Sequence, residues 1–257
     1  MILSAPFFVP EWPMPNRIRA YSTLRYPGDS LGVYEQFNLA LHVGDDENHV
    51  LANRHQLMQL AHLPSTPRWL NQTHSNTALL AETISAEVPP NADASYTQKT
   101  GEVCVVMTAD CLPILITNKE GTEVAAIHAG WQGLAKGVIE NTLSKLSSKP
   151  ESLFIWIGPS IQQASYEVGE DFYAAFATSH TSQEMNATFL TQQHQKWLAN
   201  VPLLAVQRLM RSGVLKDNIY LSGECTYANS EKYFSYRRDG VTGRMASLIW
   251  IDNNESP

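Results

Sequence analysis

The sequence predicts an α/β or α+β fold built on a mixed sheet. Strand-like and helix-like segments interleave along the chain, which is typical of α/β proteins. Short hairpin links also occur, and these argue against a purely parallel sheet. Apolar residues make up 44% and charged residues 17% of the 257 residues. A chain of this length and composition can bury a full core without disulfides or a structural metal.

The individual elements follow from local patterns. Short apolar or alternating runs predict strands. They are Ile18–Arg25, Arg68–Thr73, Val103–Thr108, Leu112–Thr117, Glu123–His128, Leu153–Ile157, Asn218–Leu221 and Arg244–Ile251. Helical spacing of apolar residues predicts helices. They are Val50–Ala61, one helix within 129–146, Gly169–Thr178 and Val201–Ser212. Acidic residues stand just before the first of these helices, where they favour a helix N-terminus.

Charge and cysteine content exclude several classes of protein. The chain has 18 Lys and Arg against 25 Asp and Glu, a net charge of −7. This balance argues against general binding to nucleic acid or to a membrane surface. An odd cysteine count of three does not form a disulfide framework and indicates a reducing compartment. We therefore expect a cytoplasmic protein that binds neither nucleic acid nor membrane, and we expect a monomer.

No linker, internal repeat or targeting segment is evident. The N-terminal stretch lacks a basic segment before its apolar residues, and prolines interrupt it. A loop signal at Glu87–Ser95 is followed at once by strand-like sequence. We therefore expect a single domain over residues 1–257.

Three side chains predict a metal site: His74, Cys111 and His128. The two strands Leu112–Thr117 and Glu123–His128 flank a tight turn and should pair as an antiparallel hairpin. Cys111 and His128 are about equally far from that turn, so they should lie nearly opposite each other. One thiolate and two imidazoles would leave a fourth position open, as in catalytic zinc sites. The spacing does not match a zinc finger or a His-Glu-x-x-His helix.

Other interpretations of the same residues stay open. A lone cysteine is often a small buried apolar residue, and a histidine at a strand end often has only a structural hydrogen bond. A Cys–His nucleophilic pair without metal is the main rival use of these groups. Asp110, beside Cys111, could act as a base or simply begin a strand.

Several motifs together resemble the YfiH-type family. They are QTHS, TADCLPILI, AAIHAGWQGLAKGV, IGPSIQQASYEVG and YFSYRRDGVTGRMASLIWI, in this order, and the likeness begins at NLALHVGDD. Members of this family are called laccase-domain protein or polyphenol oxidase, purine nucleoside phosphorylase, and peptidoglycan editing factor. The resemblance implies a compact α/β sandwich with layered sheets and outer helices. It also implies zinc held by His74, Cys111 and His128.

One departure from the family pattern concerns a second thiol. Many relatives have a cysteine just before the tyrosine of the Tyr-Glu-Val motif, where this chain has Ser165. A role for a second thiolate is therefore not expected here, while the three proposed ligands are unaffected.

The activity implied by the resemblance is chemistry on purine nucleosides. It comprises phosphorolysis of adenosine, inosine, guanosine and methylthioadenosine, and deamination of adenosine. The substrates are then small molecules, a purine nucleoside and phosphate. We expect Asp110 or Glu167 to move the proton during deamination.

Further residues in the matched motifs are candidates for substrate binding. They are Asn38, Arg54, Trp131, Arg237 and Arg238. The adjacent arginines are the strongest phosphate candidates, because a guanidinium matches phosphate geometry. The glycine-flanked turn after His128 opens a helix whose free N–H groups would suit an anion. Each residue also has a plain structural explanation: a turn asparagine, solvated arginines or a core tryptophan.

Two alternative functions use the same triad. A Cys–His hydrolase would use Cys111 as nucleophile and would suit editing of peptidoglycan precursors. A copper-dependent polyphenol oxidase would suit the laccase label, and one Cys–His₂ site could take one copper ion. The eight histidines include no His-x-His pair, however, so a multicopper centre is not expected.

Overall fold

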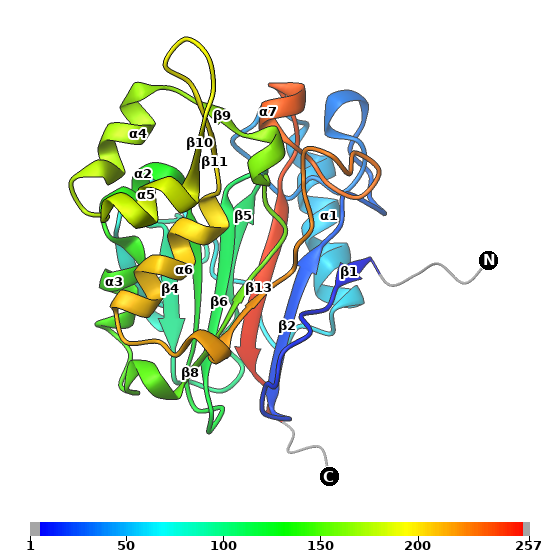
Figure 1. Cartoon of the computed structure of the whole chain (residues 1–257). Coiled ribbons are helices and arrows are strands. Elements are labelled where there is room, and N and C mark those ends of the chain that lie inside the picture. The colour runs from blue at the N-terminus through cyan, green and yellow to red at the C-terminus, as the bar shows by residue number, and fades with distance from the viewer. Residues whose placement is uncertain (1–5, 254–257) are drawn as a thin grey trace.

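The computed structural model describes residues 6–253 and stacks its elements in layers (Figure 1). Two β-sheets lie face to face, one helix covers the outer face of the smaller sheet, and a group of helices covers the larger sheet. The mixed α/β fold predicted from the sequence is confirmed, as is its arrangement as a layered sandwich.

The smaller sheet has four antiparallel strands in the order β1-β2-β13-β5. Their bounds are Phe7–Phe8 for β1, Ile18–Thr23 for β2, Met245–Ile251 for β13 and Cys104–Thr108 for β5. The last strand of the described chain therefore lies in the middle of this sheet, between two strands formed from much earlier sequence.

The larger sheet has six strands in the order β12-β8-β6-β7-β4-β3. Only the pairs β12–β8 and β3–β4 are parallel, so the sheet is mixed. The strands are β3 (Ala78–Leu80), β4 (Ala94–Thr97), β6 (Leu112–Asn118), β7 (Val124–Ala129), β8 (Leu153–Ile157) and β12 (Ile219–Leu221). A small third sheet joins β10 (Phe189–Thr191), β11 (Trp197–Ala199) and β9 (Glu167–Val168).

The helices lie outside the sheets and at one end of them. They are α1 (Glu47–Leu60), α2 (Trp131–Ala135), α3 (Val138–Leu143), α4 (Glu170–Ala177), α5 (Ser182–Thr188), α6 (Val201–Arg211) and α7 (Tyr236–Asp239). Short 3₁₀ turns occur at Gly32–Tyr34, Ala81–Thr83, Pro150–Ser152, Gln163–Ser165 and Lys216–Asn218.

Side-chain alternation along β5 shows how the layers are held together. Cys104 and Val106 face the larger sheet, where they meet Leu115 and Ala126. Val105 and Met107 face the other way, into the core beneath α1. Opposite faces of one strand thus contribute to two separate cores, as the two-residue period of a strand requires.

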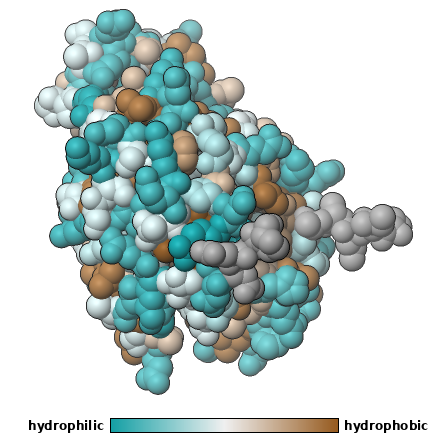
Figure 2. Space-filling view, turned by 90° about the horizontal axis from the view of Figure 1, so that it is seen from below, coloured by the Kyte–Doolittle hydropathy of each residue, from teal (hydrophilic) through white to brown (hydrophobic). Residues whose placement is uncertain are grey.

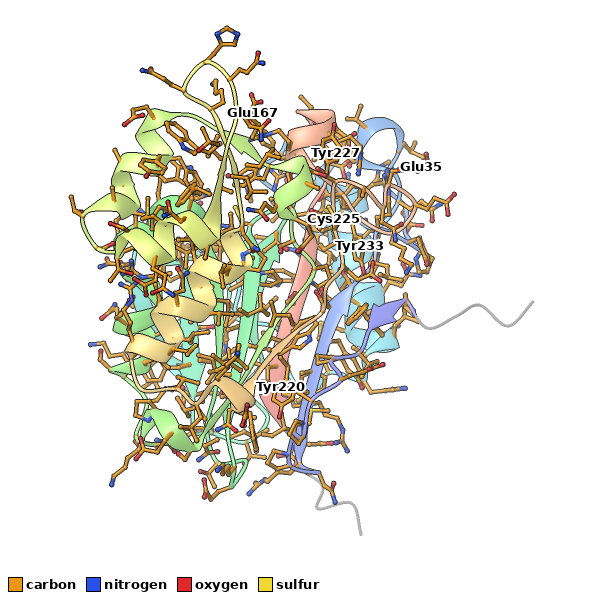
Figure 3. All side chains as sticks on the ribbon, in the orientation of Figure 1. Glu35, Glu167, Tyr220, Cys225, Tyr227 and Tyr233 are labelled. Atoms are coloured by element: carbon orange, nitrogen blue, oxygen red, sulfur yellow. The ribbon has the colours of Figure 1, made fainter. Side chains whose placement is uncertain are left out.

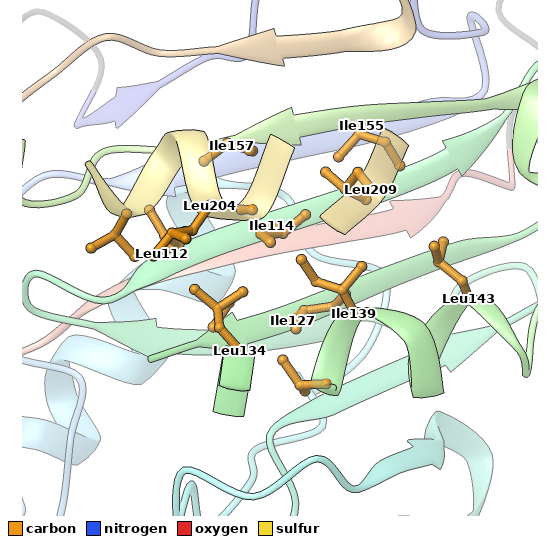
Figure 4. Close-up of a cluster of buried hydrophobic side chains, with 14 of the residues drawn as sticks. Leu112, Ile114, Ile127, Leu134, Ile139, Leu143, Ile155, Ile157, Leu204 and Leu209 are labelled. Atoms are coloured by element: carbon orange, nitrogen blue, oxygen red, sulfur yellow. The ribbon is translucent and has the colours of Figure 1, made fainter. Parts of the chain in front are cut away.

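The largest core lies between the six-stranded sheet and its helices (Figure 4). Leu204 and Leu209 of α6 and Ile139 of α3 point onto Ile114 and Ile127 of the sheet. Burial of each such side chain contributes about 1.5–3 kcal/mol to folding. This layer fixes β6 and β7, the strands that position the predicted metal ligands.

Most predicted elements are present, and two predictions are wrong. The helix expected within 129–146 is divided into α2 and α3, because Gly137 adopts a φ of 86°, outside the helical region. The segment Arg68–Thr73 forms only isolated bridges, Arg68 with Cys104 and Asn71 with Asn91. This segment supplies the loop that carries His74.

The described helices are too short or too polar to cross a membrane. The face shown in Figure 2 is mostly hydrophilic, with apolar residues scattered singly over it. Such scatter is normal for the surface of a folded domain.

Candidate metal centre

The β6–β7 hairpin brings Cys111 and His128 to the same end of the larger sheet. His128 pairs with Pro113, and Ala129 pairs with Leu112. Cys111 precedes β6 directly and lies two residues from Pro113, so the antiparallel register sets it beside His128 at the end away from the turn. This is the arrangement expected from the position of the turn in the sequence.

His74 reaches the same place from a loop. Its backbone has a φ of 55°, a left-handed conformation that non-glycine residues adopt only when their surroundings hold them there. The Asp93 carboxylate provides that support by accepting hydrogen bonds from the N–H groups of Thr73, His74 and Ser75. The loop is therefore fixed through its backbone, and the imidazole can point toward Cys111.

The three side chains form one cluster. Cys111 Sγ lies 3.7 Å from His74 Nε2, and the two imidazole rings meet edge to face with centroids 4.8 Å apart. One nitrogen of each histidine and the cysteine sulfur all lie within 4.8 Å of one another. Within residues 6–253, no other group of three or more Cys, His, Asp or Glu side chains converges in this way.

Asp93 also fixes the orientation of His128. Its Oδ1 lies 2.8 Å from His128 Nδ1, which leaves Nε2 directed toward the cluster. Burial alone would raise the pKa of Asp93, but hydrogen bonds from His128 and Ser75 lower it to about 2. A carboxylate held ionised behind a histidine is the usual outer partner of a metal-binding imidazole.

Cys111 and His128 stabilise each other as a charged pair. Burial opposes ionisation of the Cys111 thiol, yet the neighbouring His128 and His74 lower its pKa to about 6. Burial likewise opposes protonation of His128, while Cys111 and Asp93 raise its pKa to about 9. The cysteine is thus held as a thiolate, the form that binds metals and acts as a nucleophile.

Gly130 makes room for the cluster. A Cβ atom at this position would lie 2.7 Å from His74 Nε2 and 3.2 Å from Cys111 Sγ. Any side chain here would displace the imidazole, so a close approach of the backbone explains this glycine.

The cluster lies in the wall of a cavity of about 470 Å³. The cavity is also lined by Trp131 and Tyr166 and by the cationic residues Arg237 and Arg244. A cavity of this size fits a small organic molecule. The three potential ligands therefore face a space that a substrate can enter.

Asp110 lies in the cavity wall with its carboxylate engaged. It accepts hydrogen bonds from Thr226 Oγ1 at 2.6 Å, from Ser235 Oγ at 3.0 Å and from the Arg237 N–H at 2.7 Å. The residue also has a φ of 89°. These contacts tie the loop before α7 to the residue that precedes Cys111. A catalytic role for Asp110 stays a prediction.

Glu167 and Trp131 occupy different positions relative to the cavity. Glu167 is exposed on β9, near the upper end of the molecule in Figure 3, and does not line the cavity. Its role in proton transfer also stays a prediction. Trp131 lines the cavity and stacks on Phe172 with ring centroids 5.1 Å apart. It is available for contact with a flat ligand.

Two predicted substrate contacts lie behind the cavity wall. Asn38 is fully buried, and its amide bonds to Ala40, Asp45 and the Arg244 N–H. Arg54 donates to the Leu39 carbonyl and lies 3.9 Å over the Trp69 ring. Burial lowers the pKa of Arg54 to about 10. Neither residue lines the cavity, so direct contact of either with substrate stays a prediction.

The adjacent arginines are separated by the fold. Arg237 lines the cavity and lies over the Tyr166 ring at 4.6 Å. Arg238 points away and is engaged by Asp239 and by the carbonyls of Thr226, Tyr227 and Tyr233. Only the first of the pair faces the candidate site.

Sequence reasoning missed two residues of this site. Asp93 forms hydrogen bonds to both histidines. A single Asp between two alanines belongs to no sequence pattern that would predict this role. Arg244 lines the cavity from the position just before β13. The only sequence feature that could have indicated Arg244 is its position in the same basic motif as Arg237.

Comparison with known proteins identifies the family. Residues 19–252 match the family model described as multi-copper polyphenol oxidoreductase laccase. The chain is 46% identical over 243 residues to purine nucleoside phosphorylase YfiH of Shigella flexneri, covering 95% of this chain and 98% of that protein. The chain belongs to the YfiH family of laccase-like proteins.

Other members of the YfiH family agree in sequence and in structure. The purine nucleoside phosphorylase of Haemophilus influenzae is 42% identical over 243 residues, covering 95% of this chain and 98% of that protein. A crystal structure of a Neisseria meningitidis protein superposes with a TM-score of 0.91 and 41% identity, over 96% of this chain and all of that one. The YfiH protein of Bacillus licheniformis gives a TM-score of 0.90 at 25% identity, over 98% of both chains. The family resemblance seen in the motifs is confirmed.

Proposed function

We propose that this protein is a zinc-dependent purine nucleoside phosphorylase that also deaminates adenosine. The observation that carries the proposal is the cluster of His74, Cys111 and His128 in the wall of a cavity of nucleoside size. The names of the relatives support phosphorolysis. Adenosine, inosine, guanosine and methylthioadenosine are the proposed substrates.

The donor set fits zinc. One thiolate and two imidazole nitrogens are ligands that Zn²⁺ prefers, and three protein ligands are typical of its catalytic sites. Zinc bound here would supply Lewis acidity at the wall of the cavity. Asp93 would keep His128 in the correct tautomer, and Trp131 would stack on the purine base.

Copper chemistry has less support. The family description refers to several copper ions. The described part of this chain has one convergent group of three ligands, which could hold one ion. A copper-dependent oxidation would therefore use a single ion, unlike a multicopper enzyme.

Replacement of His74 tests the proposal. His74→Ala removes one ligand, so we expect kcat/KM for phosphorolysis and for adenosine deamination to fall by about 100-fold or more. The measurement is formation of ribose 1-phosphate and of inosine from adenosine by zinc-loaded protein. His55→Ala, on the exposed face of α1, is the matched control. Unchanged rates in His74→Ala would overturn the proposal.

A second candidate function is a metal-free Cys–His hydrolase acting on peptidoglycan precursors. The observation that favours it is the chain of contacts from Asp93 through His128 to Cys111, with an ionised thiol. An acidic group behind a histidine beside a nucleophile is the common arrangement of such hydrolases.

Metal analysis distinguishes the two candidates. Protein purified without added metal should contain about one zinc per chain, lost in Cys111→Ala, if the first is correct. Metal-free protein that hydrolyses a muropeptide amide, and loses this activity when Cys111 is alkylated, would support the second.

A further inference from the structure

Two guanidinium groups face the cavity without a carboxylate partner. Most salt bridges in the described part of the chain pair arginine or lysine with nearby Asp or Glu, but none includes Arg237 or Arg244. The protein as a whole carries a net charge of −7. Arg237 is exposed, and its Nη1 donates to the Glu167 carbonyl at 2.7 Å. Arg244 is half-buried, and a cation withdrawn from water without a charged partner in an acidic protein indicates that a ligand supplies the negative charge.

Arg244 is the deeper of the two. Its side chain is half-buried, and Nη1 donates to the carbonyls of Thr242 and Gly243. Within residues 6–253, no hydrogen-bond partner is found for Nε or Nη2. These two atoms form the edge of the guanidinium that commonly binds an oxyanion through two parallel bonds.

The fold places Arg244 next to the metal cluster. It directly precedes β13, whose first residue, Met245, pairs with Thr108 at the end of β5. Cys111 follows only three residues after Thr108. Both strand ends lie at the same end of the sandwich as α7, which carries Arg237 (Figure 1). The buried Asn38 amide fixes the backbone of Arg244 by accepting its N–H at 3.0 Å.

Other anion-binding candidates in the sequence do not face the cavity with free donors. Arg238 is saturated by Asp239 and three carbonyl groups. The turn at Gly130 opens a helix of only five residues, and Gly130 lies against His74 and Cys111. Arg237 and Arg244 are therefore left as the groups that can hold an anion in the cavity.

We propose that Arg244, assisted by Arg237 at the rim, binds inorganic phosphate as the second substrate beside the His74–Cys111–His128 cluster. This inference rests on the proposed phosphorylase function and names the residues of its phosphate subsite. In the reaction a phosphate oxygen forms a bond to C1′ of the ribose as the C1′–N9 bond breaks. The electron pair of that bond leaves with the purine, which takes up the proton that the attacking hydrogen phosphate releases.

Steady-state kinetics of Arg244 variants test the subsite. In zinc-loaded Arg244→Gln we expect KM for phosphate to rise by about 10- to 100-fold, because a charge-assisted bidentate contact is lost. The rise in KM for phosphate should exceed any rise in KM for adenosine by more than about threefold, because the lost contact is made to phosphate. Arg244→Lys keeps the positive charge but loses the planar guanidinium that can form two parallel hydrogen bonds, so it should give an intermediate KM for phosphate.

A charge-matched control separates the loss of a direct contact with phosphate from a change in the electrostatic field of the whole protein. Lys119→Gln removes one positive charge from the exposed β6–β7 turn, at the far end of the hairpin from the cluster. It should leave KM for phosphate unchanged. The melting temperature and zinc content of every variant are measured alongside, so that a misfolded variant is recognised. If Arg244→Gln is misfolded, the KM of Arg244→Lys for phosphate tests the proposal instead.

Direct binding separates failure of this inference from failure of the proposed function. We expect phosphate to raise the melting temperature of zinc-loaded wild type, and not that of Arg244→Gln. If wild type shows this shift but no phosphorolysis, phosphate binding at Arg244 stands, while the proposed function and the role of phosphate as second substrate both fail. If wild type performs phosphorolysis and Arg244→Gln keeps its KM for phosphate, the subsite is wrong. If Arg244→Gln is no longer inhibited by adenosine 5′-monophosphate but keeps its KM for phosphate, Arg244 binds the phosphate group of a nucleotide, and the proposal is wrong.

Discussion

Asp93 determines the position of both histidines with a single side chain. Its carboxylate accepts hydrogen bonds from the backbone of the His74 loop and from His128 Nδ1, and it is completely buried. Its backbone carbonyl also accepts the His128 N–H at 2.7 Å. The left-handed conformation of His74 and the tautomer of His128 therefore depend on the same carboxylate.

Asp93→Asn should weaken zinc binding. The amide keeps the shape of the side chain but loses the charge and one acceptor, so we expect a loss of about 10- to 100-fold in zinc affinity. The free energy of unfolding should fall by about 3 kcal/mol, because buried donors lose a charged acceptor. Competition with a chromophoric chelator and urea unfolding measure the two effects.

Ser75→Ala is the matched control for this carboxylate. It removes one hydroxyl donor to Asp93 and leaves the contact with His128 intact. Zinc affinity should then stay within about threefold of wild type. Wild-type affinity in Asp93→Asn would contradict the role given to Asp93.

At the scale of elements, ion pairs stabilise the chain just before β5. Glu102 is 6% exposed and pairs with Arg68 at 2.8 Å and with Lys99 at 3.0 Å. Burial opposes ionisation of Glu102, but Lys99 and Arg68 hold its pKa below the usual range. The pair with Arg68 ties β5 to the segment that leads to the His74 loop, where only isolated bridges occur.

This pairing predicts a pH dependence of stability. Because the pKa is lower in the folded state, the stabilisation is fully present above the unfolded value of about 4.3 and is lost as the pH falls through the folded value. Glu102→Gln should lower the free energy of unfolding by about 1–2 kcal/mol at pH 7. The difference from wild type should shrink toward pH 3.

Urea unfolding at a series of pH values measures the effect. Glu120→Gln, in the exposed turn after β6, serves as control and should track wild type at every pH. A difference for Glu102→Gln that does not change between pH 7 and pH 3 would show that the ion pairs do not cause it.

At the scale of the whole molecule, the cluster joins the loop that carries His74 to the end of the β6–β7 hairpin. His74 comes from a loop, Cys111 from the link between β5 and β6, and His128 from β7. A metal bound by all three would stabilise the folded state over the unfolded chain.

Removal of the metal should therefore lower the melting temperature. Zinc at about 1,000 times its dissociation constant stabilises the folded state by about 4 kcal/mol. For a chain of 257 residues this corresponds to about 8–16 °C. Calorimetry with and without a chelator measures the shift, and His74→Ala should lose most of it. Equal melting temperatures with and without chelator would contradict metal binding at this cluster.

The sequence predicts those features that depend on local patterns. The β6–β7 hairpin follows from a turn between two apolar runs, and its register then brings Cys111 and His128 together. The division between α2 and α3 depends on one glycine with a positive φ, which apolar periodicity does not reveal. Asp93 acts through hydrogen bonds to distant segments, and Arg244 lies beside the cavity because β13 pairs with β5. Local sequence patterns reveal neither contact.

The central position of β13 has a consequence for biosynthesis. A ribosome makes β2 and β5 long before β13, yet both strands pair with β13 in the finished sheet. During translation each of these strands presents an unpaired edge, the kind of surface on which nascent chains associate wrongly. The same late segment delivers Arg244 to the cavity, so a growing polypeptide acquires its sheet and its full cavity wall together.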